Sequence, residues 1–391
     1  MKKFIYIGAF ELPNKNAAAQ RVVANAKIFR ALGADVELIG VDKGGDIEDG
    51  ISKIESELSH IQFKSISYPK SKKDWLYYLV GDKNIIEFLK TNHKDLDTVF
   101  LYNYPAIASL RIKLLLSCLG VRVICDITEW YSPEGEGFIF KLIKWFDTTF
   151  RIRFVASMGD DGVITTSQFM SDFYTKKGIR VLELPTLYDS VNLNRYKIKN
   201  KPKTPENKKK FIYFGSPFDV ERAIKARSTI KERLDLLILA FNKLVKLYDF
   251  KFDIYGISKN EYLRVYPEHE DIIVSLKGSL FFYGKVEHKL LLLKIQEYDY
   301  TVFLRDLTLV NLAGFPSKMA ESISLGVPVI TNELPNLKKY SNCNGVFLCK
   351  KGTELEILES ALNDKLECSG VDTSFFDYKN YLNKARLFLK L

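Results

Sequence analysis

Residues 314–330 read GFPSKMAESISLGVPVI, and this stretch decides the fold. Pro316 suits the first position of a helix, because its missing N–H would have no intrahelical partner there. Gly326 suits the residue after the helix end, and Pro328 prevents the helix from continuing. The apolar run 327–331 is typical of a short buried strand. We therefore expect a helix that leads directly into a strand of a parallel sheet.

The start of this helix also has the features of a binding site. Gly314 would let a ligand approach the backbone, where unpaired N–H groups and the helix dipole favour an anion. Glu321 lies further along the helix and does not neutralise that anion site, so we expect it to bind something else. The alternative is a surface pair between Lys318 and Glu321, which leaves Gly314 and Pro316 unexplained.

The whole chain has the size and pattern of two α/β domains. Its 391 residues are 47% hydrophobic and 13% aromatic, which is enough for two globular cores. Segments typical of strands alternate with segments typical of helices, and the pattern restarts near residue 211. We therefore predict two doubly wound, Rossmann-like domains that face each other across a cleft, with ligands at the carboxyl ends of the strands.

Composition suggests where the domains divide. We expect an N-terminal domain over 1–190, a linker over 191–210 and a C-terminal domain over 211–372. The last segment, 373–391, is expected to form a helix that packs back on the N-terminal domain. The stretch 197–210 holds seven lysines and one glutamate in a chain of net charge +10. Because it lacks aromatic residues, it favours a solvated linker over a nucleic-acid-binding segment.

Missing motifs exclude several common functions. A dinucleotide fold requires GxGxxG after its first strand, and the two candidate turns offer only Gly8 and Gly215. The sequence has no HExxH or CxxC motif, and its histidines and cysteines are scattered, so we expect no metal site. The histidines are His60, His93, His269 and His288, and the cysteines are Cys118, Cys125, Cys343, Cys349 and Cys368. The cysteines are expected to be reduced thiols in a cytoplasmic protein.

Four segments of the second half carry a family resemblance. They are FIYFGSP with KERLDLLILAF (211–217 and 231–241), FDIYG (252–256), FFYGKVEHKLLLLKIQEYDYTVFL (281–304) and AGFPSKMAESISLGVPVI (313–330). In this order they resemble the nucleotide-sugar-binding domain of retaining glycosyltransferases of the GT-B architecture, in the family 4 group. The first half resembles the acceptor domain more loosely, through VITTSQFM (163–170) and LPTLYD (184–189).

The resemblance implies a nucleotide-sugar donor site. In that family, backbone N–H groups at the helix start hold the donor diphosphate, and an acid matched by Glu321 hydrogen-bonds the nucleotide ribose. Lys231 matches the lysine that neutralises the leaving diphosphate, with Arg222 as the alternative; solvated loop charges are the simpler interpretation of both. The other donor-binding positions implied are Gly314, Phe315, Pro316, Ser317, Gly215, Ser216, Gly256, Gly284, Lys285 and Val286.

One departure from the family pattern concerns the donor sugar. The usual motif has a second acid eight residues before the first, and this chain has Ala313 there. The sequence resembles a branch with the pattern N-x-A-G-F-P-x-K-x-x-E. In this branch we expect Arg305, Asn311 or Lys318 to take over contacts to the sugar or the phosphates.

The first half supplies the expected acceptor side. Asn16, Ala17 and Ala18 occupy the place of the family's glycine-rich first loop, where Asn16 can cap a helix. Helix propensity explains the alanines equally well. The region where the family usually has a histidine instead contains Asp126 and Glu129. Both carboxylates are candidates to orient an acceptor hydroxyl, and ordinary surface acids are the alternative.

The implied reaction moves a sugar from a nucleotide diphosphate to an acceptor hydroxyl with retention. A departing phosphate oxygen can take the acceptor's proton, and helix N-termini with Lys231 can stabilise the leaving diphosphate. We therefore expect no protein base, metal or cofactor beyond the nucleotide sugar itself. Two alternatives remain: a nucleotide-sugar epimerase on the same architecture, and a catalytically silent module that binds a nucleotide sugar or a partner enzyme.

The segment 138–154, FIFKLIKWFDTTFRIRF, predicts an amphipathic helix. Its broad apolar face would contain Phe138, Leu142, Trp145, Phe146 and Ile152, and its narrow polar stripe Lys141, Lys144, Thr148 and Arg151. One interpretation packs this helix on the sheet of the acceptor domain. The other rests it on anionic lipid at the cytoplasmic leaflet. Such docking would suit a lipid-linked acceptor in bacterial cell-surface polysaccharide synthesis.

Overall fold

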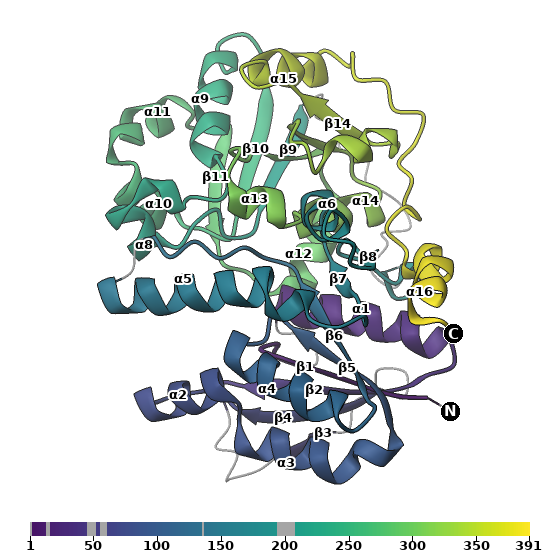
Figure 1. Ribbon diagram of the computed structural model, residues 1–391. Coiled ribbons are helices and arrows are strands. Elements are labelled where there is room, and N and C mark those ends of the chain that lie inside the picture. Colours follow the sequence, from purple (N-terminus) through teal and green to yellow (C-terminus); the bar gives the residue numbers. More distant parts are fainter. Residues whose placement is uncertain (1, 13–15, 45–51, 55–60, 135–136, 194–207) are drawn as a thin grey trace.

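The computed structural model of the chain describes residues 2–12, 16–44, 52–54, 61–134, 137–193 and 208–391. These residues form two α/β halves, each built around its own sheet (Figure 1). Most of the predicted lysine-rich linker lies outside the described residues.

The N-terminal half contains an eight-stranded sheet in the order β3-β4-β2-β1-β5-β6-β7-β8. The edge strand β3 runs antiparallel to β4, and every other neighbouring pair is parallel. The strands are β1 (Lys3–Gly8), β2 (Asp35–Asp42), β3 (Ser52–Ile54), β4 (Gln62–Ser67), β5 (Leu96–Tyr102), β6 (Arg122–Ile127), β7 (Val163–Thr165) and β8 (Val181–Glu183).

The C-terminal half contains a six-stranded parallel sheet in the order β11-β10-β9-β12-β13-β14. Its strands are β9 (Lys209–Phe214), β10 (Phe250–Tyr255), β11 (Leu280–Gly284), β12 (Tyr300–Phe303), β13 (Val329–Asn332) and β14 (Val346–Cys349). In both sheets the chain starts at a central strand, builds outward, and then returns to the other side of that strand. The doubly wound prediction is thereby confirmed, with reversal points beside β1 and β9, where open α/β sheets bind ligands.

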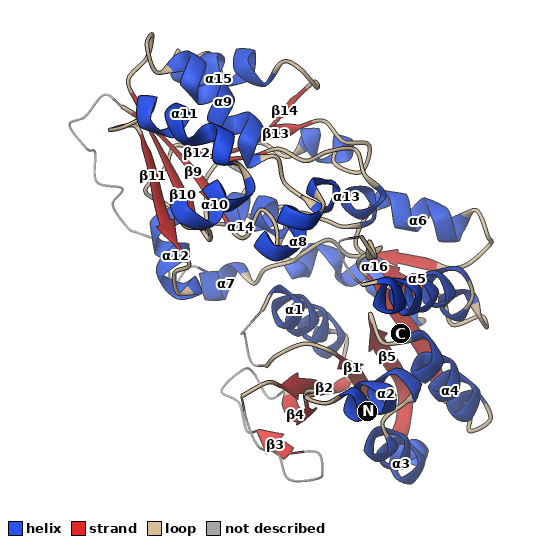
Figure 2. Ribbon diagram, turned by 90° about the vertical axis from the view of Figure 1, so that its left-hand side faces the viewer, coloured by secondary structure: helices blue, strands red, loops and turns tan. Residues whose placement is uncertain are grey.

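Helices cover both faces of each sheet (Figure 2). In the N-terminal half they are α1 (Ala17–Ala31), α2 (Lys72–Val80), α3 (Lys83–Asn92), α4 (Ala106–Ser117), α5 (Phe138–Arg153) and α6 (Gln168–Thr175). The short helix α7 (Ser190–Leu193) follows them in the chain, and its Leu193 packs in the C-terminal core. In the C-terminal half they are α8 (Val220–Lys225), α9 (Leu234–Leu244), α10 (Lys259–Val265), α11 (Glu270–Ser275), α12 (His288–Ile295), α13 (Leu309–Ala313), α14 (Ser317–Ser324) and α15 (Glu354–Leu362). The chain ends in α16 (Leu382–Leu389).

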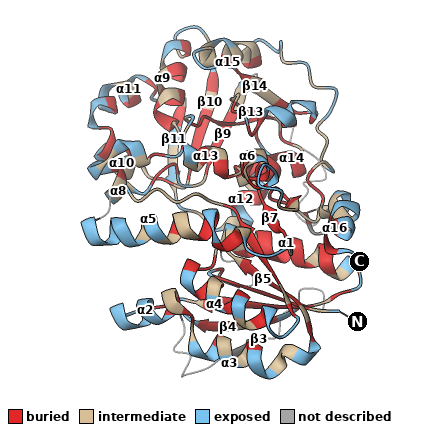
Figure 3. Ribbon diagram, in the orientation of Figure 1, coloured by how far each residue is buried: buried red, intermediate tan, exposed pale blue. Residues whose placement is uncertain are grey.

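The cores lie on the two faces of each sheet, because the parallel strands are apolar along both faces (Figure 3). On one face of the N-terminal sheet, the rings of Phe29 and Phe100 stack with their centroids 4.6 Å apart. On the C-terminal sheet, Phe241 packs against Phe252 at 4.5 Å. These aromatic contacts join a helix to a strand in each half.

The helix–strand unit of the opening stretch forms as expected, with two small shifts. Pro316 is the N-cap of α14 and the first helical residue is Ser317, one position later than predicted. Gly326 has a φ of +81°, and the Val327 N–H donates to the Ser322 carbonyl at 2.9 Å. This is a Schellman ending, which needs glycine for its left-handed residue. Because Val327 closes the helix, β13 begins only at Val329.

Helix α16 contacts α1 and β8 of the N-terminal half, although it follows the C-terminal half in the chain. Ala385, Phe388 and Leu389 belong to the core cluster beneath α1. The helix carbonyls also receive side chains of that half: Arg180 donates to the Phe388 carbonyl at 3.0 Å, and Arg122 to the Leu389 carbonyl at 3.1 Å. The chain therefore passes from the first half to the second and back.

Candidate functional site

The first element of the site is the start of α14, at the carboxyl ends of the C-terminal strands. No side chain among the described residues caps this helix. Its first N–H groups therefore keep their capacity to bind an anion. Gly314 is buried just before it, and a Cβ there would lie 3.9 Å from the carbonyl oxygen of Thr128 in the N-terminal half. The helix start thus faces the other half of the molecule.

Three glycines form the turns beside this helix. Gly215, Gly256 and Gly284 follow or end β9, β10 and β11, and all have positive φ, at +93°, +106° and +67°. A Cβ on Gly256 would lie 2.5 Å from the Gly215 carbonyl oxygen, so the two turns stack directly. The Gly256 N–H donates to the Gly284 carbonyl at 2.7 Å. Ser216 keeps its hydroxyl within its own turn, where it donates to the Phe218 carbonyl at 2.9 Å.

Beneath the Gly215 turn lies a buried charge cluster that the sequence did not predict. Lys318 donates to Glu232, and the Tyr213 hydroxyl donates to the same carboxylate at 2.5 Å. Burial opposes ionisation of Glu232, yet Lys318 and Arg305 lower its pKa below the usual value. The surface pair between Lys318 and Glu321 is therefore not the arrangement found. The Lys318 ammonium group is bound to Glu232 and lies beneath the Gly215 turn. A Cβ on Gly215 would be 3.6 Å from it.

Arg305 is the group in this cluster with capacity left for a ligand. Its Nε and Nη1 are buried without a hydrogen-bond partner among the described residues, and Nε lies 3.9 Å from Glu232. Its backbone is fixed by Asn332, which accepts from the Arg305 N–H at 2.8 Å and donates to its carbonyl at 2.7 Å. Buried unpaired donors are rare in folded proteins and suggest a missing acceptor. The expected contact from Arg305 to an anionic donor fits this position.

Asn311 and Phe315 have structural positions that do not fit the donor contacts expected of them. The side-chain amide of Asn311 donates to the carbonyls of Lys231 and Asp306, at 2.9 Å each, and the residue is fully buried. Asn311 therefore shapes the turn that carries Lys231. Phe315 points into the C-terminal core, where its ring lies 5.3 Å from Tyr340.

Ala313 lies where the family pattern would place its second acid. It is fully buried in a core cluster of the N-terminal half, and its carbonyl accepts from the Ser167 hydroxyl at 2.9 Å. A carboxylate at this position would lose its water without gaining a partner. In this arrangement of the halves, the alanine is therefore part of the contact between them.

Glu321 meets a histidine that the sequence gave no reason to select. His288, the first residue of α12, donates from Nε2 to Glu321 Oε1 at 2.5 Å. The Glu321 side chain is 7% exposed, and this hydrogen bond raises the pKa of His288 above its usual value although burial opposes it. Gln20 of α1 lies 3.4 Å from the same imidazole. Glu321, the residue predicted to bind the ribose, thus lies where α14, α12 and α1 meet.

The expected first loop lies beside this junction. Asn16 caps α1, accepting from the Ala19 N–H at 2.9 Å, and Ala17 and Ala18 form the first turn of the helix. On the opposite side, Lys285 and Val286 lie in the connection between β11 and α12, just before His288. Lys285 is exposed, and Val286 packs on the C-terminal core. The contact between these regions that reaches Glu321 runs through Gln20 of α1 and His288 of α12.

The acceptor side contains one of the two predicted carboxylates. Glu129 lies across from Lys231, with its Oε1 3.7 Å from Nζ, and the two side chains are 36% and 46% exposed. Asp126 does not fit an acceptor role, because it is fully buried and its oxygens accept from Tyr6 and from Arg21 at 2.8 Å. It anchors β6 to β1 and α1 instead.

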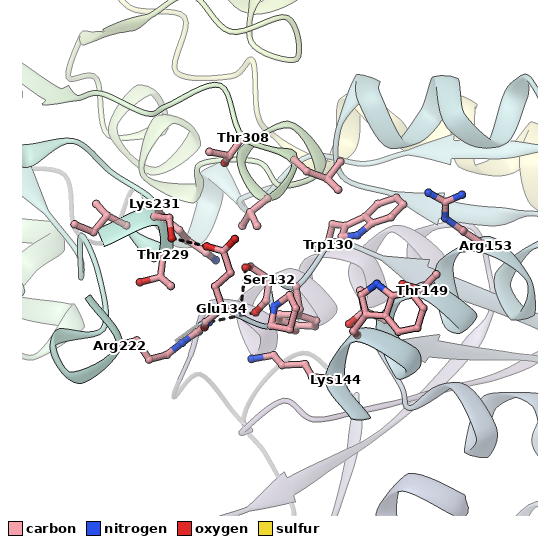
Figure 4. A pocket seen from close by; sticks show the side chains of 18 residues that line it. Trp130, Ser132, Glu134, Lys144, Thr149, Arg153, Arg222, Thr229, Lys231 and Thr308 are labelled. Carbon is pink, nitrogen blue, oxygen red and sulfur yellow. Dashed lines mark hydrogen bonds between the residues drawn. The ribbon is translucent and has the colours of Figure 1, made fainter. Parts of the chain in front are cut away.

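A cavity of about 860 Å³ lies between the halves, next to the Glu129–Lys231 pair (Figure 4). Its walls are Trp130, Tyr131, Ser132, Pro133, Glu134, Lys144, Trp145, Thr148, Thr149 and Arg153 from the first half, and Arg222, Ser228, Thr229, Ile230, Lys231, Thr308, Leu309 and Val310 from the second. Arg222 bridges the halves by donating to the carbonyls of Ser132 at 3.2 Å and Glu134 at 2.7 Å. Arg222 thus lines the same cavity as Lys231.

The described residues contain no group of three or more His, Cys, Asp or Glu side chains arranged to hold a metal ion. None of the helices described is both long enough and apolar enough to cross a bilayer. The five cysteines are free thiols.

Comparison with known proteins identifies the architecture. No model of a known protein family matches the sequence, and no curated protein matches it. Among solved structures, sucrose-phosphate synthase from Thermosynechococcus elongatus is similar over the whole chain and 98% of its own length, with a TM-score of 0.66 at 12% identity. HepE of Anabaena, solved with UDP and glucose, matches with a TM-score of 0.64 at 14% identity, over the whole of both chains. OtsA matches with a TM-score of 0.67 at 11% identity, over the whole of this chain and 99% of its own. These are GT-B glycosyltransferases, and the chain has their two-domain GT-B fold.

Proposed function

We propose that this protein is a glycosyltransferase that moves a sugar from a nucleotide-diphosphate sugar to an acceptor hydroxyl with retention. The observation that carries the proposal is the arrangement around α14. Its uncapped N-terminus and the carboxylate of Glu321 belong to one helix, and Arg305, whose Nε and Nη1 have no hydrogen-bond partner among the described residues, follows β12 at the reversal point of a doubly wound sheet. An anion and a ribose require this combination of groups. HepE solved with UDP-glucose supports the same ligand class.

The proposed mechanism depends on charge that develops on the leaving diphosphate. As the glycosidic bond breaks, the diphosphate gains negative charge, which the α14 N–H groups, Arg305 and Lys231 would stabilise. Glu129 would orient the acceptor hydroxyl, whose proton passes to a departing phosphate oxygen. Lys318 and Glu232 position these groups without contacting the sugar. The proposal requires neither a metal nor a cofactor, so the activity should persist in a chelator.

The proposed setting is the cytoplasmic face of a membrane. Most of α5 is exposed in its N-terminal half, including Phe138 and Ile139, and only Thr148, Arg151 and Ile152 are buried. The interpretation of this segment as core packing therefore holds only for its last turns. We place the protein as a peripheral enzyme of cell-surface polysaccharide or glycoconjugate synthesis, with a lipid-linked acceptor.

The proposal is tested first on the donor and then on turnover. A ligand that binds the native state raises the melting temperature, so UDP-, GDP-, ADP- and dTDP-sugars are compared by thermal shift. The stabilising donor is then incubated with a panel of acceptors, and the anomeric configuration of the product is read by NMR. Donor conversion without an acceptor would indicate an epimerase, and binding without any turnover a silent module.

A further inference from the structure

The connection between β9 and β10 is longer than the sheet requires. Helix α9 alone provides the crossover, yet α8 and the short turn Arg227–Thr229 precede it. We call this additional segment, residues 219–230, the strap. It is fixed to its own half, because Ala223 belongs to the C-terminal core and Arg227 donates to the Val265 carbonyl at 2.7 Å. The strap is therefore a part of the C-terminal half that takes no share in its sheet.

Three hydrogen bonds join the strap to the N-terminal half (Figure 4). Arg222 donates to the carbonyls of Ser132 at 3.2 Å and Glu134 at 2.7 Å. The Ser228 hydroxyl donates to the Glu134 carboxylate at 2.5 Å. All four residues line the cavity between the halves. The three bonds therefore close one side of the cavity, between the strap and residues 132–134.

These bonds differ from the other contacts between the halves in being open to water. Glu134, which accepts two of the three, is an exposed residue. Water competes for exposed donors and acceptors, so such bonds contribute little net stability and can break and form again readily. By contrast, the Ser167 hydroxyl donates to the Ala313 carbonyl where both residues are buried. Opening at the strap therefore costs less than separating the two halves.

The strap ends beside the residues proposed to act on the acceptor and the leaving group. Ile230 is its last residue, and the next one, Lys231, has its Nζ 3.7 Å from Glu129 Oε1. The side-chain amide of Asn311 donates to the Lys231 carbonyl at 2.9 Å, so this end of the strap is anchored. A molecule that occupies the cavity therefore has the strap on one side and lies next to the Glu129–Lys231 pair.

We propose that Arg222, Ser228 and Glu134 form a latch that closes the cavity over the acceptor and opens to admit and release it. That the occupant is the acceptor rests on the proposed transferase function, whereas the closure itself does not. With the latch closed, water is kept from the Glu129–Lys231 pair, which protects the donor from hydrolysis. With the latch open, the cavity exchanges its contents with the solvent. The latch thus controls both acceptor entry and the ratio of transfer to hydrolysis.

The fluorescence of Trp130 reports access to the cavity, because this residue lines it and is partly buried. The chain has three tryptophans, so Trp75→Phe with Trp145→Phe leaves Trp130 as the single emitter, and acrylamide serves as a neutral quencher. Adding Arg222→Met with Ser228→Ala removes the donors of the latch but keeps most of the bulk of the wall. We expect the acrylamide quenching constant to rise at least about twofold, because the open form becomes well populated.

Arg264→Met is the matched control. Arg264 donates to Glu221 of the strap at 2.7 Å from within the C-terminal half, so its loss should leave the quenching unchanged. Ser228→Thr keeps the hydroxyl and should also behave as the unmodified latch does. Thermal unfolding confirms that each variant is folded.

A second readout is hydrolysis of the stabilising nucleotide sugar without any acceptor, which should rise in the latch variant. Unchanged quenching or unchanged hydrolysis in that variant would overturn the proposal. So would quenching of Trp130 in the intact latch as strong as that of free N-acetyltryptophanamide, because the cavity would then be open with the latch formed. Failure to bind any nucleotide sugar would count against the proposed function and not against the latch, since the quenching experiment requires no donor.

Discussion

Glu321 is the residue on which the proposed donor site depends most directly. Its carboxylate is nearly buried and accepts from His288, so a ribose hydroxyl would have to compete for it. Glu321→Ala removes a charged hydrogen-bond acceptor, which contributes about 1.5–3 kcal/mol. We expect UDP affinity to fall by roughly 10- to 100-fold in calorimetry, with the fold intact. Glu356→Ala, at an exposed acid of α15, is the control. Unchanged UDP affinity in Glu321→Ala would contradict the ribose assignment.

His288 makes donor binding depend on pH. The hydrogen bond to Glu321 raises the folded pKa of His288 above the unfolded value near 6.5, so the ion pair is fully formed below that value. As the pH rises through the folded pKa, His288 loses its positive charge, and the weaker hydrogen bond that remains competes less with the ribose for the Glu321 carboxylate. We therefore expect UDP affinity to increase with pH above about 6.5.

His288→Gln supplies the comparison for this pH dependence. The phosphate of UDP also titrates near pH 6, but it does so equally with either protein. Calorimetry at a series of pH values should show that UDP affinity depends less steeply on pH for His288→Gln than for the wild type. Identical slopes would exclude His288 as the titrating group.

Lys231 should act mainly on turnover. Its ammonium group is half-exposed and pairs with Glu129, and the charge that it would meet on the diphosphate grows in the transition state. We expect Lys231→Ala to lower kcat roughly 100-fold with a small change in KM for the donor. Lys225→Ala, an exposed lysine of α8, should retain full activity. A variant in which KM alone changes would assign Lys231 to ground-state binding.

Single residues were the hardest part of the site to predict from the sequence. The glycine turns, α14 and Glu321 follow from local patterns, and all lie where ligands bind such sheets. Glu232 and His288 were missed because their partners, Lys318 and Glu321, are distant in the sequence and become neighbours only when the strand ends align. Asp126 was misassigned for the same reason, since Arg21 neutralises it from another element.

At the scale of elements, alternation of strands and helices predicted both sheets, because a parallel sheet needs a helix in each crossover. Periodicity could not decide which face of a helix would be covered. For α5 the apolar pattern leaves both core packing and membrane docking open, and only the exposure of its first half in the folded chain, beyond its contact with α4, shows which part is covered. The exposed half is therefore a result of tertiary structure, not of the amphipathic pattern.

This exposed half of α5 leads to a prediction about membranes. Aromatic side chains at the interface and lysines at anionic headgroups should bind the protein to vesicles, with roughly 1 kcal/mol from each lysine near the surface. We expect the protein to float with vesicles of anionic lipid but not with neutral ones, and less so at high salt. Lys141→Glu with Lys144→Glu should abolish flotation, while Lys176→Glu with Lys277→Glu, at exposed sites elsewhere, should not. Absence of flotation at low salt would contradict docking.

At the scale of the whole molecule, the two halves are joined at several places. The Arg222 bridge and the Ser167–Ala313 hydrogen bond join the halves on the side of the site. On the far side, α16 returns from the C-terminal half and completes the core of the N-terminal one. Domain closure over a donor would exclude water from the reaction. The return of α16 keeps the halves linked through two crossings of the chain, which limits how they can separate.

The contribution of α16 can be measured at Phe388. Its ring lies against Gly162, where a Cβ would be 2.8 Å away, and beneath the Arg180 guanidinium at 5.5 Å. Phe388→Ala would leave a cavity between α16 and β7, at a cost of about 3–5 kcal/mol in the free energy of unfolding. Leu387→Ala, at the next residue on the exposed face, should stay within about 0.5 kcal/mol of the wild type. Chemical denaturation of the two variants isolates the loss of packing, because alanine raises helix propensity slightly in both. Equal stability of the two variants would mean that α16 does not hold the N-terminal half together, and that the halves are linked by the interdomain contacts alone.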